Sequence, residues 1–432
     1  MLHYIQCNMD KIIIKSIIIE KQKEVSETEL VERNITFDCN ANYVIVGIRR
    51  AGKSYQMFQN IKKKVHSGAA KFEDCLYVNF EDERIASITA SELGLLIECY
   101  EELYENRKPD IYLDEIQNIK GWEKFARRLA DSKYRVMITG SNAKMPSKDI
   151  ATTLGGRYII REIFPFSFNE YLEWNSIELG ENWAYYKEIQ RNIKRYFETY
   201  LQFGGFAETF NLTNKREWIN SLYQKILLGD IIARNGIRNG NAIRLLSKKL
   251  AESVMQPTTQ TRLLNIVKST GNSIGRNTIA EYLTYMEDAY LTFKVLNFTD
   301  SMAERSTTCK RYFLDNGLLN NFIIHDGPKL LENIVAIDLI KRYRKAENDN
   351  VFYYNKNVEV DFYVPEYNLA VQVAYSISDQ TTREREIRAL VKLSTVFHIE
   401  EAVIVTMDEE YLFEENGLAI TAIPAWKWLL RE

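Results

Sequence analysis

Histidine and cysteine are scarce in this chain of 432 residues, which has four histidines and five cysteines. The cysteines are scattered at positions 7, 39, 75, 99 and 309, without a Cys-x-x-Cys pair. With so few histidines, no cluster has the ligand spacing of a zinc site. These absences exclude the zinc-binding classes, and they predict that the cysteines are buried, reduced thiols.

Long apolar runs and an excess of one charge are missing too. The apolar run at residues 12–19 is broken by Lys15, and no stretch approaches the roughly 20 residues of a membrane span. We find no signal-peptide pattern. The net charge is −3, so any contact with nucleic acid must be local. We therefore expect a cytoplasmic protein without membrane contact, and its length predicts several domains.

A phosphate-binding pattern stands near the N-terminus. The sequence GIRRAGKS at residues 47–54 fits G-x-x-x-x-G-K-[ST] and follows the apolar run 43–46, which predicts a buried strand. Lys53 would reach the β- and γ-phosphates, and Ser54 would hold a magnesium ion. The alternative is a glycine turn before an ordinary helix. The residues expected to surround the nucleotide are Gly47, Arg49, Arg50, Gly52, Lys53, Ser54 and Tyr55.

A second apolar strand, residues 111–115, ends in the adjacent carboxylates Asp114 and Glu115. This is a Walker B pattern. Asp114 would hold the magnesium ion through its water shell, and Glu115 would polarise the attacking water as a general base. The alternative is a solvated acidic turn at the end of a strand. A further apolar strand at 135–139, which ends in polar residues, favours the nucleotide interpretation.

Several segments resemble the AAA-type ATPases that carry a C-terminal domain of unknown function, specifically DUF4143. The resemblance covers nearly the whole chain and rests on GIRRAGKS, YLDEIQNIKGWEKF, VMITGSNA, LGGRYIIREIFPFSFNEYL and YLQFGGFAE. It implies ATP and Mg²⁺ as cofactors, with ATP bound between neighbouring subunits of a homo-oligomer. It also implies Asn142 as a sensor of the γ-phosphate, with Ser141 as a near alternative. Arg157 becomes a candidate arginine finger or sensor, and the alternative for it is an ion pair with a surface carboxylate at a helix end.

The alternation of strands with helices up to residue 165 predicts an α/β fold, with a mostly parallel P-loop sheet of the AAA type and the nucleotide at the carboxyl ends of the strands. The expected strands are 43–47, 75–80, 111–114, 135–140 and 158–163. The expected domains are an N-terminal lead-in at 1–36, helical from about residue 9, a P-loop ATPase domain at 37–175, a helical lid at 176–241, a winged-helix domain at 242–327 and a restriction-endonuclease-like domain at 328–432.

Residues 242–314 predict three helices, near 242–255, 259–268 and 276–288, and then two strands, the order of a winged helix. If this region binds double-stranded DNA, Arg276, Asn277 and Thr278 could face base edges, while Lys294, Lys310 and Arg311 would lie on the wing and near the backbone. Ten basic against six acidic residues make the region only modestly basic. Docking of a protein partner, or a place in the ATPase lid, is the alternative.

The last region resembles a restriction-endonuclease-like core that has lost part of its active site. Glu332 and Asp361 occupy two positions of the acidic motif of that fold, but Gln372 and Ala374 stand where a second carboxylate and a lysine would be. A neutral amide is a poor magnesium ligand, and alanine cannot stabilise a phosphorane. We therefore expect no nuclease activity and a binding or packing role for this domain.

Three functions remain open from the sequence. The first is an ATPase whose turnover switches the winged-helix and nuclease-like domains between arrangements. The second is a nucleotide-gated switch that recruits protein partners with little turnover. The third, an ATP-dependent nuclease, is disfavoured by Gln372 and Ala374.

Overall fold

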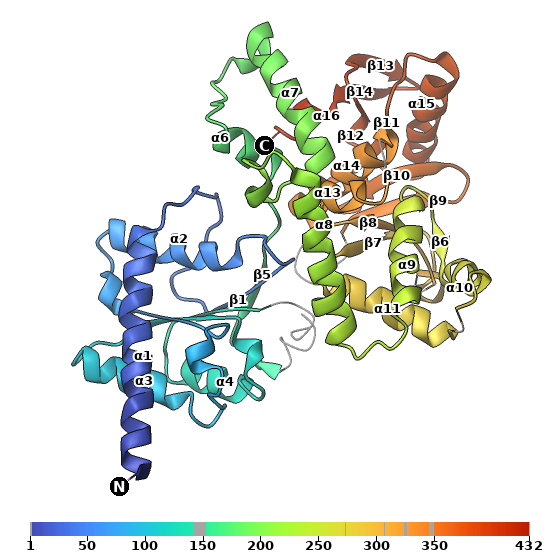
Figure 1. Ribbon diagram of the computed structural model, residues 1–432. Coiled ribbons are helices and arrows are strands. Elements are labelled where there is room, and N and C mark those ends of the chain that lie inside the picture. The colour runs from blue at the N-terminus through green and yellow to red at the C-terminus, as the bar shows by residue number, and fades with distance from the viewer. Residues whose placement is uncertain are drawn as a thin grey trace. The chain divides into compact units, whose positions relative to one another are not determined.

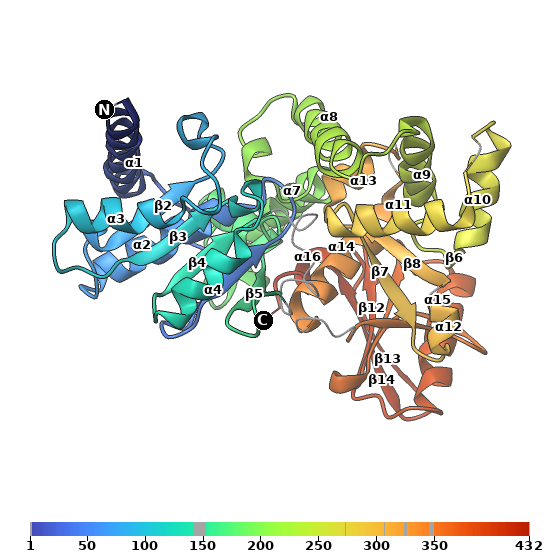
Figure 2. The ribbon, with the colours of Figure 1, turned by 90° about the horizontal axis from the view of Figure 1, so that it is seen from below.

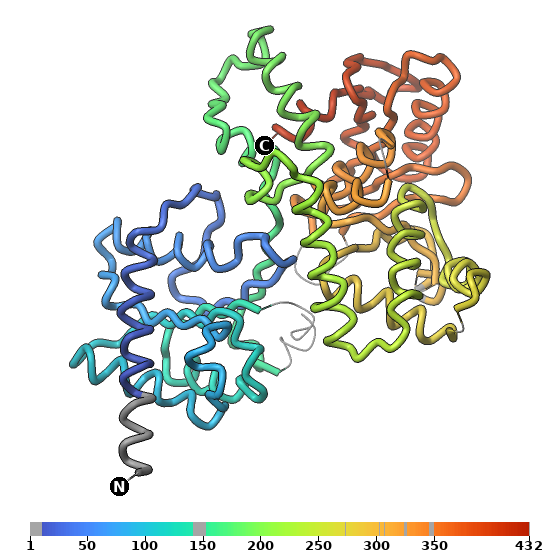
Figure 3. Tube along the Cα trace, in the orientation of Figure 1, coloured from blue at the N-terminus to red at the C-terminus, as the bar shows by residue number. Residues whose placement is uncertain are grey.

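The computed structural model describes residues 2–140, 153–272, 274–305, 307–323, 326–344 and 350–431, with the backbone alone for residues 2–10 and 302 (Figure 3). The chain divides into two compact units, Met1–Ile163 and Phe164–Glu432. The division lies inside the region 37–175 that we expected to form the ATPase domain. Each unit is described by itself below.

The first unit is built on a five-stranded sheet with the strand order β2-β3-β4-β1-β5, in which every neighbouring pair is parallel. The strands are β1 (Tyr43–Val46), β2 (Cys75–Asn79), β3 (Asp110–Asp114), β4 (Val136–Thr139) and β5 (Ile159–Glu162). All residues of β1 and β4 are buried, as expected of apolar strands in a sheet covered on both faces. The five predicted strands and their parallel arrangement are confirmed.

Helices and short turns connect these strands (Figure 1). They are α1 (Leu2–Glu27), α2 (Lys53–His66), η1 (Phe72–Asp74), η2 (Glu83–Ile85), α3 (Gly94–Leu103), η3 (Ile116–Asn118) and α4 (Glu123–Asp131). Because all five strands are parallel, their carboxyl ends lie at one edge of the sheet. The phosphate loop, which joins β1 to α2, lies at that edge, and so do Asp114 and Thr139 at the ends of β3 and β4.

Helix α1 is part of this unit, since it packs beside α3 and the edge strand β2 (Figure 1). Gln22 donates a hydrogen bond to the carbonyl oxygen of Cys75 at 3.0 Å, and Lys11 forms an ion pair with Glu102 at 2.8 Å. The helix ends at Glu27, earlier than the predicted position near 36. The chain after it is not helical and carries Arg33, whose buried guanidinium donates to the carbonyl oxygen of Ala51 at 3.2 Å.

The second unit begins with helices and continues with a nine-stranded sheet of order β13-β14-β12-β11-β10-β9-β7-β8-β6. The helical elements are α6 (Phe168–Trp174), η5 (Trp183–Tyr185), α7 (Lys187–Phe203), η6 (Ala207–Thr209), α8 (Lys215–Lys225), the π-helical η7 (Ile226–Ala233), α9 (Gly240–Glu252), α10 (Gln260–Ser269), α11 (Arg276–Asp288), α12 (Met302–Arg305), α13 (Asn316–Asn320), α14 (Gly327–Tyr343), η8 (Pro365–Tyr367), α15 (Gln380–Ser394) and α16 (Ala425–Trp428). The strands are β6 (Thr258–Thr259), β7 (Thr292–Asn297), β8 (Thr308–Phe313), β9 (Phe352–Asn355), β10 (Glu359–Val364), β11 (Leu369–Ala374), β12 (Glu401–Thr406), β13 (Tyr411–Glu415) and β14 (Leu418–Pro424).

The three helices and two strands predicted for 242–314 are present as α9, α10, α11, β7 and β8, and α11 packs along β7 (Figure 2). The sequence did not indicate β6, which pairs with β8. Strand β7 also pairs with β9 in parallel, with Leu296 opposite Phe352. One sheet therefore runs across residue 327, where we had placed a domain boundary.

Two glycine segments meet around a buried carboxylate in this unit. Asp315 accepts hydrogen bonds from the backbone N–H of Gly205 at 2.8 Å and of Gly317 at 2.7 Å. Gly204 has φ 71°, and a Cβ at this position would lie 2.0 Å from Oδ1 of Asp315. Burial raises the pKa of Asp315 to about 6. The tight approach explains why two consecutive glycines follow α7.

The predicted buried thiols are found at Cys75, Cys99 and Cys309, whereas Cys39 is exposed. Burial raises the pKa of Cys75 to about 12 and that of Cys99 to about 11. Among the helices that the structure describes, none combines the length and the apolar character needed to cross a membrane.

Candidate functional site

The phosphate loop depends on glycine at two positions between β1 and α2. Gly47 has φ 143° and Gly52 has φ 89°. A Cβ on Gly47 would lie 2.1 Å from the carbonyl oxygen of Ile163, because the chain after β5 passes against the loop. Only glycine fits there, so the loop keeps its backbone open toward the carboxyl edge of the sheet.

Lys53 opens α2, and its side chain turns back into this loop. Its ammonium is buried and donates to the carbonyl oxygens of Gly47 at 3.1 Å and Ile48 at 3.2 Å. The structure thus places the positive charge of Lys53 within the turn of the loop. To bind the phosphates, Lys53 would exchange these carbonyl contacts for phosphate oxygens.

The other predicted loop residues lie less deeply. Arg49 is 4.0 Å from Glu81, which follows β2. Arg50 is exposed and has φ 67°, a left-handed conformation that is unusual for a side chain of this kind. Tyr55 is 56% exposed, with its ring beside that of Phe58 at a centroid distance of 5.9 Å. The side chains of Arg49, Arg50 and Tyr55 are thus less deeply buried than that of Lys53.

Asp114 ends β3 in a buried position where hydroxyl groups hold its carboxylate. Tyr77 donates to Oδ2 at 2.5 Å, and Thr139 donates to Oδ1. Burial and the charge of Asp114 raise the pKa of Tyr77, and the side chain of Ser54 lies close enough to oppose this shift. The two residues predicted to hold magnesium, Ser54 and Asp114, therefore both lie near the phenol of Tyr77.

Glu115 follows directly, in a left-handed conformation with φ 54°. Its backbone N–H donates to Oγ1 of Thr139 at 3.0 Å, and its carboxylate accepts a hydrogen bond from the amide of Gln117. Burial raises the pKa of Glu115, while the charge of Lys53 opposes this shift. A carboxylate with a raised pKa is a stronger base, which suits the predicted role.

Sequence inspection missed Tyr77, Thr139 and Gln117. Thr139 had a signal, because it is a polar residue at the carboxyl end of an apolar strand, as Asp114 is. Tyr77 lies within a continuous apolar run, and Gln117 lies in a short 3-10 turn. The roles of Tyr77 and Thr139 follow from the strand order, which places β3 between β2 and β4.

The remaining predicted residues of this site lie elsewhere. Asn142 and Ser141 fall outside the described residues. Arg157 precedes β5 and forms an ion pair with Asp131 at 2.7 Å, at the C-terminal end of α4. Since β5 is parallel to β1, Arg157 lies at the amino edge of the sheet, opposite Lys53. It cannot act on a nucleotide bound to its own loop, and a role at a neighbouring subunit stays a prediction.

The predicted residues of the C-terminal region are partly brought together. Asp361 and Glu332 both lie within 4 Å of the Lys310 ammonium, and Gln372 accepts a hydrogen bond from the backbone N–H of Asp361 at 2.7 Å. Ala374 lies at the end of β11 and is buried in the apolar core of the sheet.

The placement of Lys310 and Arg311 on a DNA-facing wing is wrong. Lys310 has no exposed surface, and Arg311 is 7% exposed and lies 3.5 Å from Glu287. Lys294, on β7, is 3.6 Å from the same carboxylate. β8 lies inside the nine-stranded sheet rather than in a free wing, because β6 covers one of its edges and β7 the other.

Sequence models of known families match two parts of the chain. An AAA domain matches residues 40–172. A domain of unknown function, DUF8612, matches residues 194–328, in place of the DUF4143 domain that we expected. The parallel sheet and the glycine loop with Lys53 lie within residues 40–172, the part of the chain that the AAA model matches.

The chain is 31% identical over 436 residues to the uncharacterized protein MJ1544 of Methanocaldococcus jannaschii, and the alignment covers 97% of this chain and 96% of that protein. It belongs to the family of this archaeal protein. It is also 28% identical over 373 residues to an uncharacterized protein of Haemophilus influenzae, with 83% and 88% of the two chains covered.

Among solved structures, the chain is similar to the Walker-type ATPase PABY2304 of Pyrococcus abyssi, with 13% identity, a TM-score of 0.35 and coverage of 65% of this chain and 90% of that one. It is also similar to the ORC2 protein of Aeropyrum pernix, with 12% identity, a TM-score of 0.37 and coverage of 71% and 89%.

Proposed function

We propose that this protein binds ATP with Mg²⁺ at the carboxyl edge of the first sheet and hydrolyses the bond between the β- and γ-phosphates. One observation carries the proposal. Lys53, Ser54, Asp114 and Glu115, from two separate sequence motifs, converge at the ends of β1 and β3, and Lys53 is close enough to oppose the raised pKa of Glu115. A cation for phosphate, two metal-binding oxygens and a base are the parts that this chemistry needs.

The residues present fit a magnesium ion. Asp114 accepts a hydrogen bond from the hydroxyl of Tyr77, and Ser54 lies close enough to affect the pKa of the same hydroxyl, so both oxygens lie near one point. Mg²⁺ in such sites takes one or two protein oxygens and completes its shell with waters and phosphates. When bound, it would neutralise charge on the β- and γ-phosphate oxygens. Ser54 and Asp114 would hold it, and Tyr77 would release their oxygens to do so.

Glu115 would act as the general base for the attacking water. Its position beside Thr139, at the end of the neighbouring strand, fixes its backbone. Gln117 holds its carboxylate in the absence of substrate. For catalysis the carboxylate would turn from Gln117 toward a water in line with the γ-phosphate, and it would accept the proton from that water.

We further propose that the second unit delivers the output of this cycle. The order α9-β6-α10-α11-β7-β8 supports a winged helix, and Arg276 and Asn277 are exposed at the first turn of α11, next to Thr278. Double-stranded DNA is the partner that this helix would suit. The burial of Lys310 and Arg311 removes two of the expected phosphate contacts, so DNA binding would rest on α11 itself.

A second candidate is a nucleotide-gated switch with little turnover that recruits a protein partner. The hydrogen bonds of Lys53 to loop carbonyls and of Glu115 to Gln117 favour it, because both catalytic groups are engaged by their own chain. In this case ATP binding alone would change the state of the protein. Lys53 and Ser54 would be required, but Glu115 would not.

Steady-state ATP turnover tests the two candidates, with and without duplex DNA at moderate salt. Lys53→Ala and Glu115→Gln should each lower turnover by roughly a hundredfold or more. Lys120→Ala, an exposed lysine in the loop after β3, is the matched control and should not change it. Stimulation by DNA would support a DNA-coupled ATPase. Tight ATP binding without turnover would favour the switch.

A further inference from the structure

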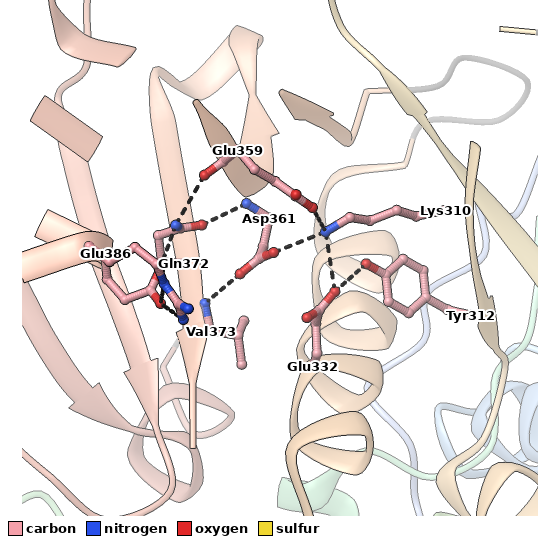
Figure 4. Close-up of polar contacts among 9 residues, drawn as sticks. Lys310, Tyr312, Glu332, Glu359, Asp361, Gln372, Val373 and Glu386 are labelled. Carbon is pink, nitrogen blue, oxygen red and sulfur yellow. Dashed lines mark hydrogen bonds and ion pairs between the residues drawn. The ribbon is translucent and has the colours of Figure 1, made fainter. Parts of the chain in front are cut away.

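Lys310 has its charge in an unusual place for a lysine. It lies on β8, and its side chain has no exposed surface. The ammonium lies 2.9 Å from Asp361, 3.0 Å from Glu359 and 3.5 Å from Glu332 (Figure 4). These acids come from β10 and α14, so one cation joins three elements of the second unit.

Lys310 contacts acids on elements that do not pair with its own strand. In the strand order, β7 and β9 lie between β8 and β10. The ammonium also lies over the ring of Tyr353 on β9, at 5.6 Å from its centroid. A lysine can bury its apolar stem in this way while its ammonium reaches charged partners.

The oxygens and amides around the ammonium are otherwise satisfied. Tyr312 donates to Glu332 at 2.7 Å, and the backbone N–H of Val373 donates to Asp361 at 3.0 Å (Figure 4). Gln372 donates to Glu386 at 2.7 Å and to the backbone carbonyl oxygen of Glu359 at 3.2 Å. The Gln372 amide therefore links β11 to the backbone of Glu359 and Asp361 on β10. The three carboxylates of Glu332, Glu359 and Asp361 converge on Lys310.

Glu332, Glu359 and Asp361 form a group that we call the carboxylate centre, and its negative charge must be balanced by a cation. The fully buried ammonium of Lys310 lies within 3.5 Å of an oxygen of each acid, so its charge offsets theirs. Three carboxylates this close together are tolerated only with a positive charge between them.

We propose that the ammonium of Lys310 is the resident cation of this carboxylate centre. It holds the position that a divalent metal ion would take between Glu332, Glu359 and Asp361. The centre is consequently closed to divalent ions in the native protein, and it becomes a site for a hard divalent cation such as Mn²⁺ once the lysine is replaced. This inference concerns the second unit and does not depend on the proposed ATPase activity.

The burial of the participants supports the closed state. Lys310 and Glu332 have 0% and 1% of their side chains exposed, Asp361 has 15%, and Glu359 has 44%. Oxygen ligands in this number are what Mg²⁺ and Mn²⁺ prefer. The lysine of this centre comes from β8 and not from position 374 on β11, where the sequence pattern led us to look for one.

Thermal unfolding of the full chain without nucleotide tests the proposal, with and without 1 mM Mn²⁺. Tryptophan fluorescence follows mainly the second unit, because only Trp122 of the six tryptophans lies in the first. Lys310→Met should lower the Tm by on the order of 10 °C, since it leaves buried carboxylates without a cation. Mn²⁺ should restore several degrees of this loss. It should not restore them in Lys310→Met/Asp361→Asn.

Lys294→Met is the matched control, since Lys294 lies on the adjacent strand with 44% of its side chain exposed. Its Tm should stay close to that of the native chain, with or without Mn²⁺. A Lys310→Met variant that melts with the native protein would overturn the proposal, and so would one that Mn²⁺ leaves unchanged.

A second measurement remains decisive if Lys310→Met does not fold. Mn²⁺ binding to the nucleotide-free protein, followed by electron paramagnetic resonance, should be the same for the native chain and for Asp361→Asn. A class of bound Mn²⁺ that is present in the native chain and lost in Asp361→Asn would show an open metal site, and the proposal would be wrong.

Discussion

Asp114 and Glu115 owe their positions to side chains that neither sequence motif contains. Tyr77 and Thr139 hold the carboxylate of Asp114 from the two neighbouring strands, and Gln117 holds that of Glu115. Hydroxyl and amide groups of this kind fix the direction in which a reacting side chain points. At the scale of single residues, they are the places where the proposed catalysis is most open to test.

Replacement of Thr139 by valine should slow ATP turnover by about ten- to a hundredfold, with ATP binding retained. Valine has the same shape but leaves the buried N–H of Glu115 without its acceptor, which costs about 1–3 kcal/mol. Thr139→Ser keeps the hydroxyl and should retain most of the turnover. Equal losses in the two variants would show that loss of the hydroxyl alone does not explain the effect.

Replacement of Gln117 by alanine should change the pH dependence of turnover. The amide of Gln117 lowers the pKa of Glu115 by bonding its charged form, against the stronger effect of burial. Without it the pKa rises, so the acid limb of the kcat/KM profile, which reports the free enzyme, should move to higher pH. Asn118→Ala, in the same turn, is the control. An unshifted limb would mean that Glu115 is not the titrating base.

The sequence was informative about these residues only where the signal is local. Lys53, Ser54, Asp114 and Glu115 each follow an apolar strand at a fixed spacing, and all lie at the predicted edge. Tyr77 gave no comparable signal, because its partner Asp114 is set by strand order, and Gln117 lies in a short turn without a recognised pattern. Lys310 was assigned to the wrong surface, since its partner Asp361 lies 51 residues further along the chain.

At the scale of elements, the junction between α7 and the segment after it depends on close packing rather than on helix propensity. Gly204 ends α7 with φ 71° and ψ −159°, a region that is essentially restricted to glycine. Gly205 would place a Cβ 2.1 Å from the carbonyl oxygen of Phe166. Asp315, at the start of α13, fills the remaining space and bonds the glycine backbone.

Gly204→Ala should therefore destabilise the second unit by about 2–4 kcal/mol, through backbone strain and contact with Asp315. Chemical denaturation followed by tryptophan fluorescence measures this change. Gly229→Ala is the matched control, because no heavy atom lies within 4 Å of the added methyl group. The explanation fails if the two alanine variants are equally stable.

The elements themselves were largely predictable, and their pairing was not. Periodicity located all five strands of the first sheet and the helices α9, α10 and α11. It did not reveal β6, which has two residues, or the parallel pairing of β7 with β9. The amino-acid sequence of a strand that is buried on both faces does not indicate which strand will pair with it.

At the scale of the whole molecule, Arg157 sets a condition on assembly. It lies at the amino edge of its own sheet and pairs with Asp131. If it contributes to catalysis, it must do so at the loop of another subunit. The proposed homo-oligomer then follows from the location of this one side chain.

Mixing two inactive variants tests this condition. Arg157→Ala should lower turnover at least a hundredfold if it removes an arginine finger. Adding Lys53→Ala protein, which is inactive but keeps Arg157, should restore part of the turnover. Asp131→Asn should not lower turnover, because it removes only the resting partner of Arg157. Absence of any recovery in the mixture would exclude a shared site.

The strand pairing in the nine-stranded sheet determines where the chain can be divided into fragments without loss of paired strands. A fragment that begins at residue 328 would carry Glu332, Glu359 and Asp361 but not Lys310, and β9 would lose β7 as its neighbour. The regions on either side of residue 327 must therefore be inherited, expressed and exchanged together. A division before Phe164, in contrast, leaves every strand of both sheets with its partners.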